Sequence, residues 1–253
     1  MPQTGSSFVI LKQVDSTNNY AMGKVHAGMA KHGDAYFSSN QTAGKGQRGK
    51  AWETADGVNI ALSLVLDVQL LNASQQFQLL VSVALGCYDF FSSYAGHETS
   101  IKWPNDIYWR DRKAVGVLIE NSFHGSDWKF AVVGIGVNVN QTGFDPSLKN
   151  PVSLKQITGK TYDLIALARE LQNHILNRFG ALQREPFGLS LADYNEHLFG
   201  LHKKMHLKKG PVHFDAVIQG VTAFGQLVTK ESHQERQFDF GEVEWVVGGI
   251  SDV

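Results

Sequence analysis

A glycine-rich loop over residues 41–52 combines small and cationic residues in a pattern typical of an anion-binding site. Its charged and small positions are Gly44, Lys45, Gly46, Arg48, Gly49 and Lys50. Glycine lets backbone N–H groups approach an anion closely, and nearby cations neutralise the charge of that anion. The loop is not a P-loop, because no Gly-Lys-Ser/Thr sequence ends it, and its glycine spacing differs from the dinucleotide fingerprint. A solvated surface loop is the alternative interpretation.

A second polar group forms a proline turn over residues 102–106. Lys102, Asn105 and Asp106 flank Pro104, which fixes the turn at the end of a predicted strand. Lysine pairs with phosphate, and aspartate binds Mg²⁺ or orients a nucleophile. An Asx-type turn with incidental charges explains the same residues about equally well.

Two strands after this turn add a lysine and a pair of glycines. Lys113 stands at the mouth of the predicted strand 114–120, although a lysine in that position is usually solvated. Gly134 and Gly136 lie two residues apart in the predicted strand 129–139, so they share one face and leave space there for a flat ligand. Close packing of a helix against these glycines is the alternative.

The composition predicts a folded chain with no strong electrostatic preference. Of 253 residues, 43% are hydrophobic, which is enough for a large core. The formal net charge is −1, so no global field attracts nucleic acid or an anionic membrane. The single cysteine, Cys87, lies in an interrupted apolar run over residues 79–91 that is too short for a membrane span. Residues 1–7 lack a secretory pattern, so we expect a cytoplasmic protein.

The elements that must position these motifs follow from hydrophobic periodicity. Strands are predicted at residues 8–14, 35–37, 59–65, 100–103, 107–109, 114–120 and 129–139. A helix is predicted to begin at Asp15, Ser16 and Thr17, whose side chains can accept hydrogen bonds from its first N–H groups. Further helices are predicted at residues 74–94, 162–184 and 190–198. Short β runs then follow at residues 212–218, 226–229, 237–240 and 244–247. This change near Gly200 predicts two domains, residues 1–199 and 200–253.

Taken together and in their order, the motifs resemble those of the biotin protein ligase family, also called biotin–[acetyl-CoA-carboxylase] ligase. The resemblance covers about residues 8–140. It is carried by residues 15–18, 41–52, 102–106, 113–120 and 134–138. It implies an α/β (α+β) fold, in which a mixed-sheet catalytic domain with flanking helices is followed by a small C-terminal SH3-like β-barrel. It also implies the form without an N-terminal DNA-binding domain.

The resemblance implies a two-step reaction. Biotin's carboxylate attacks the α-phosphorus of ATP to give biotinyl-5′-AMP and pyrophosphate, and a carrier-protein lysine then attacks this mixed anhydride and releases AMP. ATP and Mg²⁺ are therefore expected as substrate and activating metal, with the metal's ligands unassigned and no tightly bound cofactor. The implied partner is a biotin carboxyl carrier protein domain. We expect no nucleic acid and no membrane as partners, and a homodimer is left open.

Family roles carry over to individual residues. The implied biotin contacts are Ser16, Thr17, Asn18, Gln41, Gly44, Lys45, Gly46, Gln47, Trp52, Lys113 and Gly116, with Trp52, Gly134 and Gly136 as apolar walls. The implied nucleotide contacts are Arg48, Lys102, Asn105, Asp106 and Asn138. By the same resemblance, Lys45, Arg48 and Lys113 are expected to neutralise the reacting anions, and Asp106 is expected to orient the carrier lysine.

One position departs from the family pattern, which often has Gly-Arg-Gly-Arg or Gly-Lys-Gly-Arg. This chain has Gly44-Lys45-Gly46-Gln47, and glutamine carries no charge to retain the adenylate. We therefore expect Arg48 to take over this function or to share it with Lys45. The alternative is that the Gln47 amide holds the intermediate through hydrogen bonds.

Three other functions compete with this interpretation. A lipoate or octanoyl ligase or transferase resembles the family in fold, but the combination of the glycine-rich loop with residues 102–106 favours biotin. A repressor needs a helix-turn-helix, and we expect none here because the catalytic pattern begins by Phe8. A catalytically silent binding module is the third.

The cationic run at residues 202–209 suits an acidic carrier, although a solvated charged surface explains it more simply.

Overall fold

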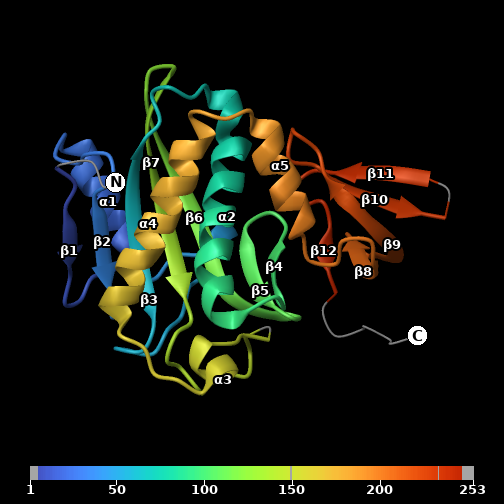
Figure 1. Cartoon of the computed structure of the whole chain (residues 1–253), viewed down its shortest axis with the longest axis horizontal. Helices are drawn as coiled ribbons and strands as arrows, with labels where there is room; N and C mark the ends of the chain where they lie inside the picture. The colour runs from blue at the N-terminus through green and yellow to red at the C-terminus, as the bar shows by residue number, and fades with distance from the viewer. Residues whose placement is uncertain (1–4, 149, 233, 247–253) are drawn as a thin grey trace.

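Two β-sheets organise the computed structural model, which describes residues 5–148, 150–232 and 234–246 (Figure 1). The larger sheet has seven strands in the order β1-β2-β3-β7-β6-β5-β4. They are β1 (Phe8–Ile10), β2 (Ala35–Ser38), β3 (Ile60–Asp67), β4 (Thr99–Lys102), β5 (Asp106–Trp109), β6 (Arg112–His124) and β7 (Asp127–Val137). Only β1 and β2 pair in parallel among these neighbours, so the predicted mixed sheet is confirmed.

Helices cover both faces of this sheet, which confirms the predicted flanking helices. The two long ones, α2 (Gln76–Ala95) and α4 (Leu164–Leu182), pack side by side on one face, and α1 (Thr17–His26) packs on the other (Figure 1). The shorter pieces are α3 (Leu154–Thr158), α5 (Phe187–Glu196) and the 3₁₀ turns Gln47–Gly49 and Ala73–Gln75. None of the described helices has the length and apolar character to cross a bilayer.

Successive side chains of the central strands point to opposite faces of the sheet, and the two faces carry different kinds of residue. Leu62 and Leu64 of β3 belong to the large core under α2 and α4, whereas Val65 belongs to a small cluster under α1. Ser63, between the two leucines, is buried among polar groups of α1. The face under α1 therefore carries small and polar side chains where the opposite face carries leucines.

The smaller sheet contains five antiparallel strands in the order β11-β10-β9-β8-β12. They are β8 (Lys204–Lys209), β9 (Val212–Val221), β10 (Leu227–Glu231), β11 (Gln234–Phe238) and β12 (Glu244–Trp245). The pairings described do not close the sheet into a barrel. Sequence analysis missed β8, because its lysines obscure the alternation of Met205 and Leu207. The last predicted strand reached Val247, which lies outside the described residues.

The smaller sheet shares buried apolar contacts with the larger one. Leu207 of β8 and Ile218 of β9 belong to the same buried cluster as Phe91 of α2. Helix α5 lies between the sheets and contacts both α2 and β9 (Figure 1). The predicted division at Gly200 thus falls within a continuous apolar cluster, and the two-domain description stays a prediction.

Two local expectations need correction. Ser16 is the N-cap residue of α1, but its side chain makes no capping hydrogen bond; the backbone N–H of Thr17 donates instead to Gln41 Oε1 at 2.8 Å. Strand β1 ends at Ile10 rather than residue 14, because Val14 forms only an isolated bridge with Gln41. Both differences arise because the glycine-rich loop returns alongside the start of α1.

Candidate active site

A buried polar cluster lies where α1 begins against the seven-stranded sheet. Gln41 Oε1 accepts hydrogen bonds from Thr17 N at 2.8 Å and Thr17 Oγ1 at 3.1 Å. The Ser63 hydroxyl lies 2.8 Å from Thr17 Oγ1 and 2.6 Å from Asn18 Oδ1. Asn18 Nδ2 donates to Glu120 Oε2 at 2.8 Å. The structure therefore brings three predicted biotin contacts together, and the predicted contact Ser16 is buried beside them.

Ser63 and Glu120 are members of this cluster that sequence analysis did not assign to the site. Ser63 is the one polar residue of the β3 segment 60–66, and that interruption of an apolar run was the available signal. Glu120 ends the matched motif 113–120, and its Oε1 lies 3.5 Å from Lys45 Nζ. Glu120 thereby connects the glycine-rich loop to Asn18.

The glycine-rich loop folds back on itself as a small hairpin. Gly46 N donates to Lys50 O at 2.7 Å, and Trp52 N donates to Gly44 O at 2.9 Å. A Cβ on Gly44 would lie 2.4 Å from Trp52 O, so only glycine permits this close approach. The loop therefore has a defined conformation beside the cluster.

Gln47 and Arg48 contact different parts of the molecule. Gln47 Nε2 donates to Asn105 Oδ1 at 2.9 Å and to Val117 O at 3.2 Å, which places this side chain against the proline turn and β6. Arg48, with a φ of 56°, donates from Nη2 to Phe240 O at 3.0 Å. Its guanidinium lies 4.5 Å from the centre of the Phe240 ring. Arg48 thus contacts the C-terminal segment, whereas Gln47 contacts a predicted nucleotide residue.

Lys113, near the start of β6, and Asp106, the first residue of β5, form an ion pair, with Lys113 Nζ 2.7 Å from Asp106 Oδ2. Both side chains are about one-third exposed, at 31% and 28%. Asn138 is buried nearby, and its Nδ2 donates to Lys113 O at 3.4 Å. Two predicted catalytic residues and one predicted nucleotide residue are therefore neighbours.

Packing from three directions fixes the proline turn. Trp103 Nε1 donates to Gly225 O at 3.0 Å, and Tyr194 Oη donates to Pro104 O at 2.8 Å. Asn105 is buried, and its Nδ2 donates to Val117 O at 3.2 Å. These contacts fix the turn that carries Asn105 and leads into Asp106.

Lys102 is the last residue of β4 and directly precedes Trp103. Its Nζ donates to Tyr108 Oη at 3.0 Å and lies 4.6 Å from the centre of that ring. Burial raises the pKa of Tyr108 well above its usual value, so the phenol stays protonated. Lys102 remains a predicted nucleotide contact.

The space left by the β-strand glycines is filled by two side chains. A Cβ on Gly134 would lie 2.3 Å from Asn18 Oδ1, and one on Gly136 would lie 2.2 Å from Trp52. Gly116, paired with Gly136 across β6 and β7, also faces Trp52. Close packing is therefore what this structure shows at Gly134, which faces α1, and the expectation that a flat ligand lies against these glycines stays a prediction.

These glycines nevertheless show that the buried cluster around Asn18 lies close to the Lys113–Asp106 pair. Gly134 and Gly136 occupy successive positions on one face of β7, so Asn18 and Trp52 cover neighbouring parts of the same surface. Lys113 Nζ lies 5.8 Å from the Trp52 ring. A series of neighbouring side chains thus runs from Gln41 and Asn18 through Trp52 to Lys113. Trp52 Nε1 is buried and has no hydrogen-bond partner among the described residues.

The sequence matches a family model described as the biotin/lipoate A/B protein ligase family over residues 10–138. The chain belongs to this family. The matched range contains every predicted site residue, and Asn138 is its last residue. The family description includes both biotin and lipoate enzymes, so membership alone does not select the acyl substrate.

Individual relatives agree with this assignment. The bifunctional ligase/repressor BirA of Escherichia coli is 25% identical over 241 residues, which cover 94% of this chain and 74% of that protein. A biotin–[acetyl-CoA-carboxylase] ligase of Paracoccus denitrificans is 35% identical over 161 residues, covering 61% and 65%. The structure of a biotin protein ligase from Aquifex aeolicus, in complex with biotin and ATP, aligns with a TM-score of 0.79 at 24% identity and covers 94% and 98% of the two chains. The last likeness establishes the shared fold.

Proposed function

We propose that this protein is a biotin–protein ligase that activates biotin with ATP and transfers it to a lysine of a biotin carboxyl carrier protein. The observation that carries the proposal is the series of neighbouring side chains from Gln41 to Lys113, which joins a buried polar cluster to a lysine–aspartate pair. The name of the relative from Paracoccus denitrificans, a biotin–[acetyl-CoA-carboxylase] ligase, and the biotin and ATP bound to the Aquifex aeolicus enzyme support biotin as the acyl substrate.

The buried polar cluster suits the ureido ring of biotin. That ring presents one carbonyl oxygen and two N–H groups, and burying them without partners would be costly. Thr17, Asn18, Gln41 and Ser63 offer both donors and acceptors within one cluster. We assign ureido recognition to these side chains, and the apolar part of biotin to the Trp52 ring.

The first step brings two anions together, so it requires positive charge. The carboxylate oxygen of biotin forms a bond to the α-phosphorus of ATP while the bond to the bridging oxygen breaks and pyrophosphate leaves. We assign neutralisation of the carboxylate and α-phosphate to Lys113, and contact with the triphosphate to Lys102. Asn105 and Asn138, both buried, are the proposed nucleotide contacts.

We propose that Mg²⁺ enters as MgATP. Among the described residues no three His, Cys, Asp or Glu side chains could hold a metal together. Asp106 is the acidic side chain of the proline turn, and it already contacts Lys113. Proteins usually bind Mg²⁺ through one or two carboxylates together with substrate phosphates, so this carboxylate would suit an Mg²⁺ ion that arrives with ATP, and the ion would help to neutralise the phosphate charge.

In the second step the carrier lysine forms an amide bond with the activated carbonyl carbon, and AMP leaves. The attacking amine must lose a proton, so a carboxylate beside it assists. Asp106 Oδ2 contacts Lys113, and we assign Oδ1 to the incoming amine. Water must be excluded from the adenylate between the steps, a function that we assign to the glycine-rich loop.

The C-terminal sheet and the setting of the reaction complete the proposal. We propose that residues 200–253 form a small SH3-like domain that borders the site, with the carrier domain as protein partner. Cys87 is fully buried, and burial raises the pKa of its thiol, which suits an unreactive core position in a reducing cytoplasm.

The test is pyrophosphate exchange into ATP by the purified chain with biotin, lipoate or octanoate in turn. We expect exchange with biotin only, followed by labelling of one lysine when a biotin carboxyl carrier domain is added. A carrier with arginine in place of that lysine is the matched control. Exchange with lipoate or octanoate and not with biotin would assign the chain to the other branch of its family, and no exchange with any acid would make it a binding module.

A further inference from the structure

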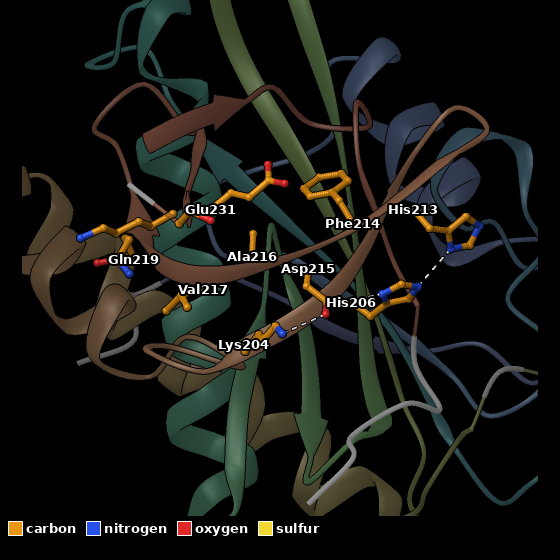
Figure 2. A pocket seen from close by; sticks show the side chains of 11 residues that line it. Lys204, His206, His213, Phe214, Asp215, Ala216, Val217, Gln219 and Glu231 are labelled. Carbon is orange, nitrogen blue, oxygen red and sulfur yellow. Dashed lines mark hydrogen bonds and ion pairs between the residues drawn. The ribbon is translucent and has the colours of Figure 1, made fainter. Parts of the chain in front are cut away.

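Two histidines face each other on the outer surface of the β8–β9 hairpin, within the smaller sheet (Figure 2). His206 Nε2 lies 3.1 Å from His213 Nδ1, and His206 Nδ1 lies 2.8 Å from Asp215 Oδ1. His206 pairs with Asp215 in the strand register, and His213 is two residues before Asp215. All three side chains therefore project from the same face of the hairpin.

Asp215 determines which nitrogen of His206 carries the proton. Hydrogen bonds from His206 and Lys204 lower the pKa of the Asp215 carboxyl, so it is ionised at neutral pH. An ionised carboxylate only accepts hydrogen bonds, so His206 Nδ1 must be the donor. In the neutral ring, Nε2 is then an acceptor, and it accepts a hydrogen bond from the Nδ1–H of His213, a bond that a metal ion at these two nitrogens would replace.

We propose that His206 and His213 bind one divalent transition-metal ion of the zinc, nickel and copper class. Imidazole nitrogens bind such ions at about 2.0–2.1 Å, and two nitrogens 3.1 Å apart then subtend an angle of about 100° at the metal. That angle suits adjacent ligands in tetrahedral or square-planar geometry. Asp215 supplies the outer carboxylate that orients many metal-binding histidines.

Water or an external ligand completes the coordination. The described residues offer no third His, Cys, Asp or Glu at a common point with these two. The histidines line an open hollow of about 850 Å³, which leaves room for those ligands (Figure 2). Imidazole ligands favour this class of metal over Mg²⁺, which separates the site from the MgATP of the proposed reaction.

Charges around the hollow limit the affinity and make it depend on pH. Lys204 and Lys208 project from β8, while Lys230 and Glu231 line the hollow from β10. Lys204 Nζ is 3.1 Å from Asp215 Oδ2, so its charge is partly balanced. Because protons compete with the metal for the imidazole nitrogens, binding weakens as the pH falls.

The experiment is electron paramagnetic resonance of the untagged full-length chain with half an equivalent of Cu²⁺. We expect hyperfine coupling to two imidazole nitrogens in the wild type. His213→Ala should leave one nitrogen and weaken Cu²⁺ binding more than tenfold, while His124→Ala, at an exposed position on the other sheet, should change neither. Zn²⁺ should raise the Tm of the wild type and of His124→Ala, but not that of His213→Ala.

Two results would overturn the site: one-nitrogen coupling in the wild type, or equal Cu²⁺ affinity in the wild type and His213→Ala. His213→Asn keeps a polar side chain at this exposed strand position and should lose the metal as His213→Ala does. A Tm equal to that of the wild type in both variants before metal is added excludes a folding defect as the cause. The measurement needs neither biotin nor ATP, so its outcome is independent of the proposed ligase activity.

Discussion

The two faces of the seven-stranded sheet use the same strands for different purposes. Toward α2 and α4, the central strands present large apolar residues such as Leu64 and Ile135, which are buried in the main core. Toward α1 and the glycine-rich loop, the adjacent residues are Ser63, Gly134 and Gly136, and these admit the side chains of Asn18 and Trp52. Alternation therefore lets one strand stabilise the fold with every second residue and build the site with the others.

The largest expected effect is on stability, at the core face. Leu64→Ala should lower the free energy of unfolding by about 2–5 kcal/mol, because Leu64 is fully buried and its removal leaves a cavity. Its neighbour Ser63→Ala should lower it by about 1 kcal/mol, the usual net contribution of one hydrogen bond. Urea unfolding measures both.

Biotin-dependent pyrophosphate exchange per folded molecule should show the opposite order. Ser63→Ala removes a hydroxyl that contacts Thr17 and Asn18, so it should raise the KM for biotin. Leu64→Ala should leave that KM near the wild-type value. If both variants changed stability and KM in parallel, the separation of the two faces would be wrong.

The next effect is on chemistry at the site face. Lys113→Gln should raise the activation free energy of adenylate formation by about 2–4 kcal/mol, because it removes the charge that neutralises the carboxylate and phosphate. Stability should change little, since the Lys113–Asp106 pair is partly exposed. Thermal unfolding and pyrophosphate exchange on one preparation measure both quantities.

Lys129→Gln is the matched control for that variant. The Lys129 side chain, on β7, is 33% exposed, close to the 31% of Lys113. Its Nζ lies 3.2 Å from Asp127 Oδ2, so it also forms an ion pair, but it is outside the site. It should leave exchange unchanged. Unchanged exchange in Lys113→Gln would remove Lys113 from the mechanism.

The sequence predicted the elements of this sheet well, because each has a clear period and turn residues at its ends. It also located two groups that the structure brings together, Thr17, Asn18 and Gln41 in one and Asp106, Lys113 and Asn138 in the other. It did not reveal the direction in which Gln47 and Arg48 point, since two adjacent loop residues diverge only once Phe240, far along the chain, is in place. It missed Ser63 because a single serine in an apolar strand does not reveal its partners.

The third effect concerns retention of the adenylate. Sequence analysis expected Arg48 to retain it, but Arg48 contacts Phe240 while Gln47 contacts Asn105. We therefore expect Gln47→Ala to release more biotinyl-AMP than Arg48→Ala, by about 1 kcal/mol or roughly fivefold. Biotin on an unrelated lysine-rich protein, added with MgATP and biotin, measures the release. Greater labelling by Arg48→Ala would restore the original assignment.

The smallest effect tests how the C-terminal segment positions the glycine-rich loop. Phe240→Leu removes the ring beneath the Arg48 guanidinium but keeps the backbone carbonyl that accepts its hydrogen bond. An exposed cation–π contact contributes about 0.5–1 kcal/mol, so trypsin should cleave after Arg48 two- to fivefold faster in this variant. Phe224→Leu is the control, because Phe224 is 89% exposed. Equal cleavage in the two variants would mean that the hydrogen bond alone places Arg48, and faster cleavage in Phe240→Leu alone would show that the smaller sheet stabilises a loop belonging to the larger one.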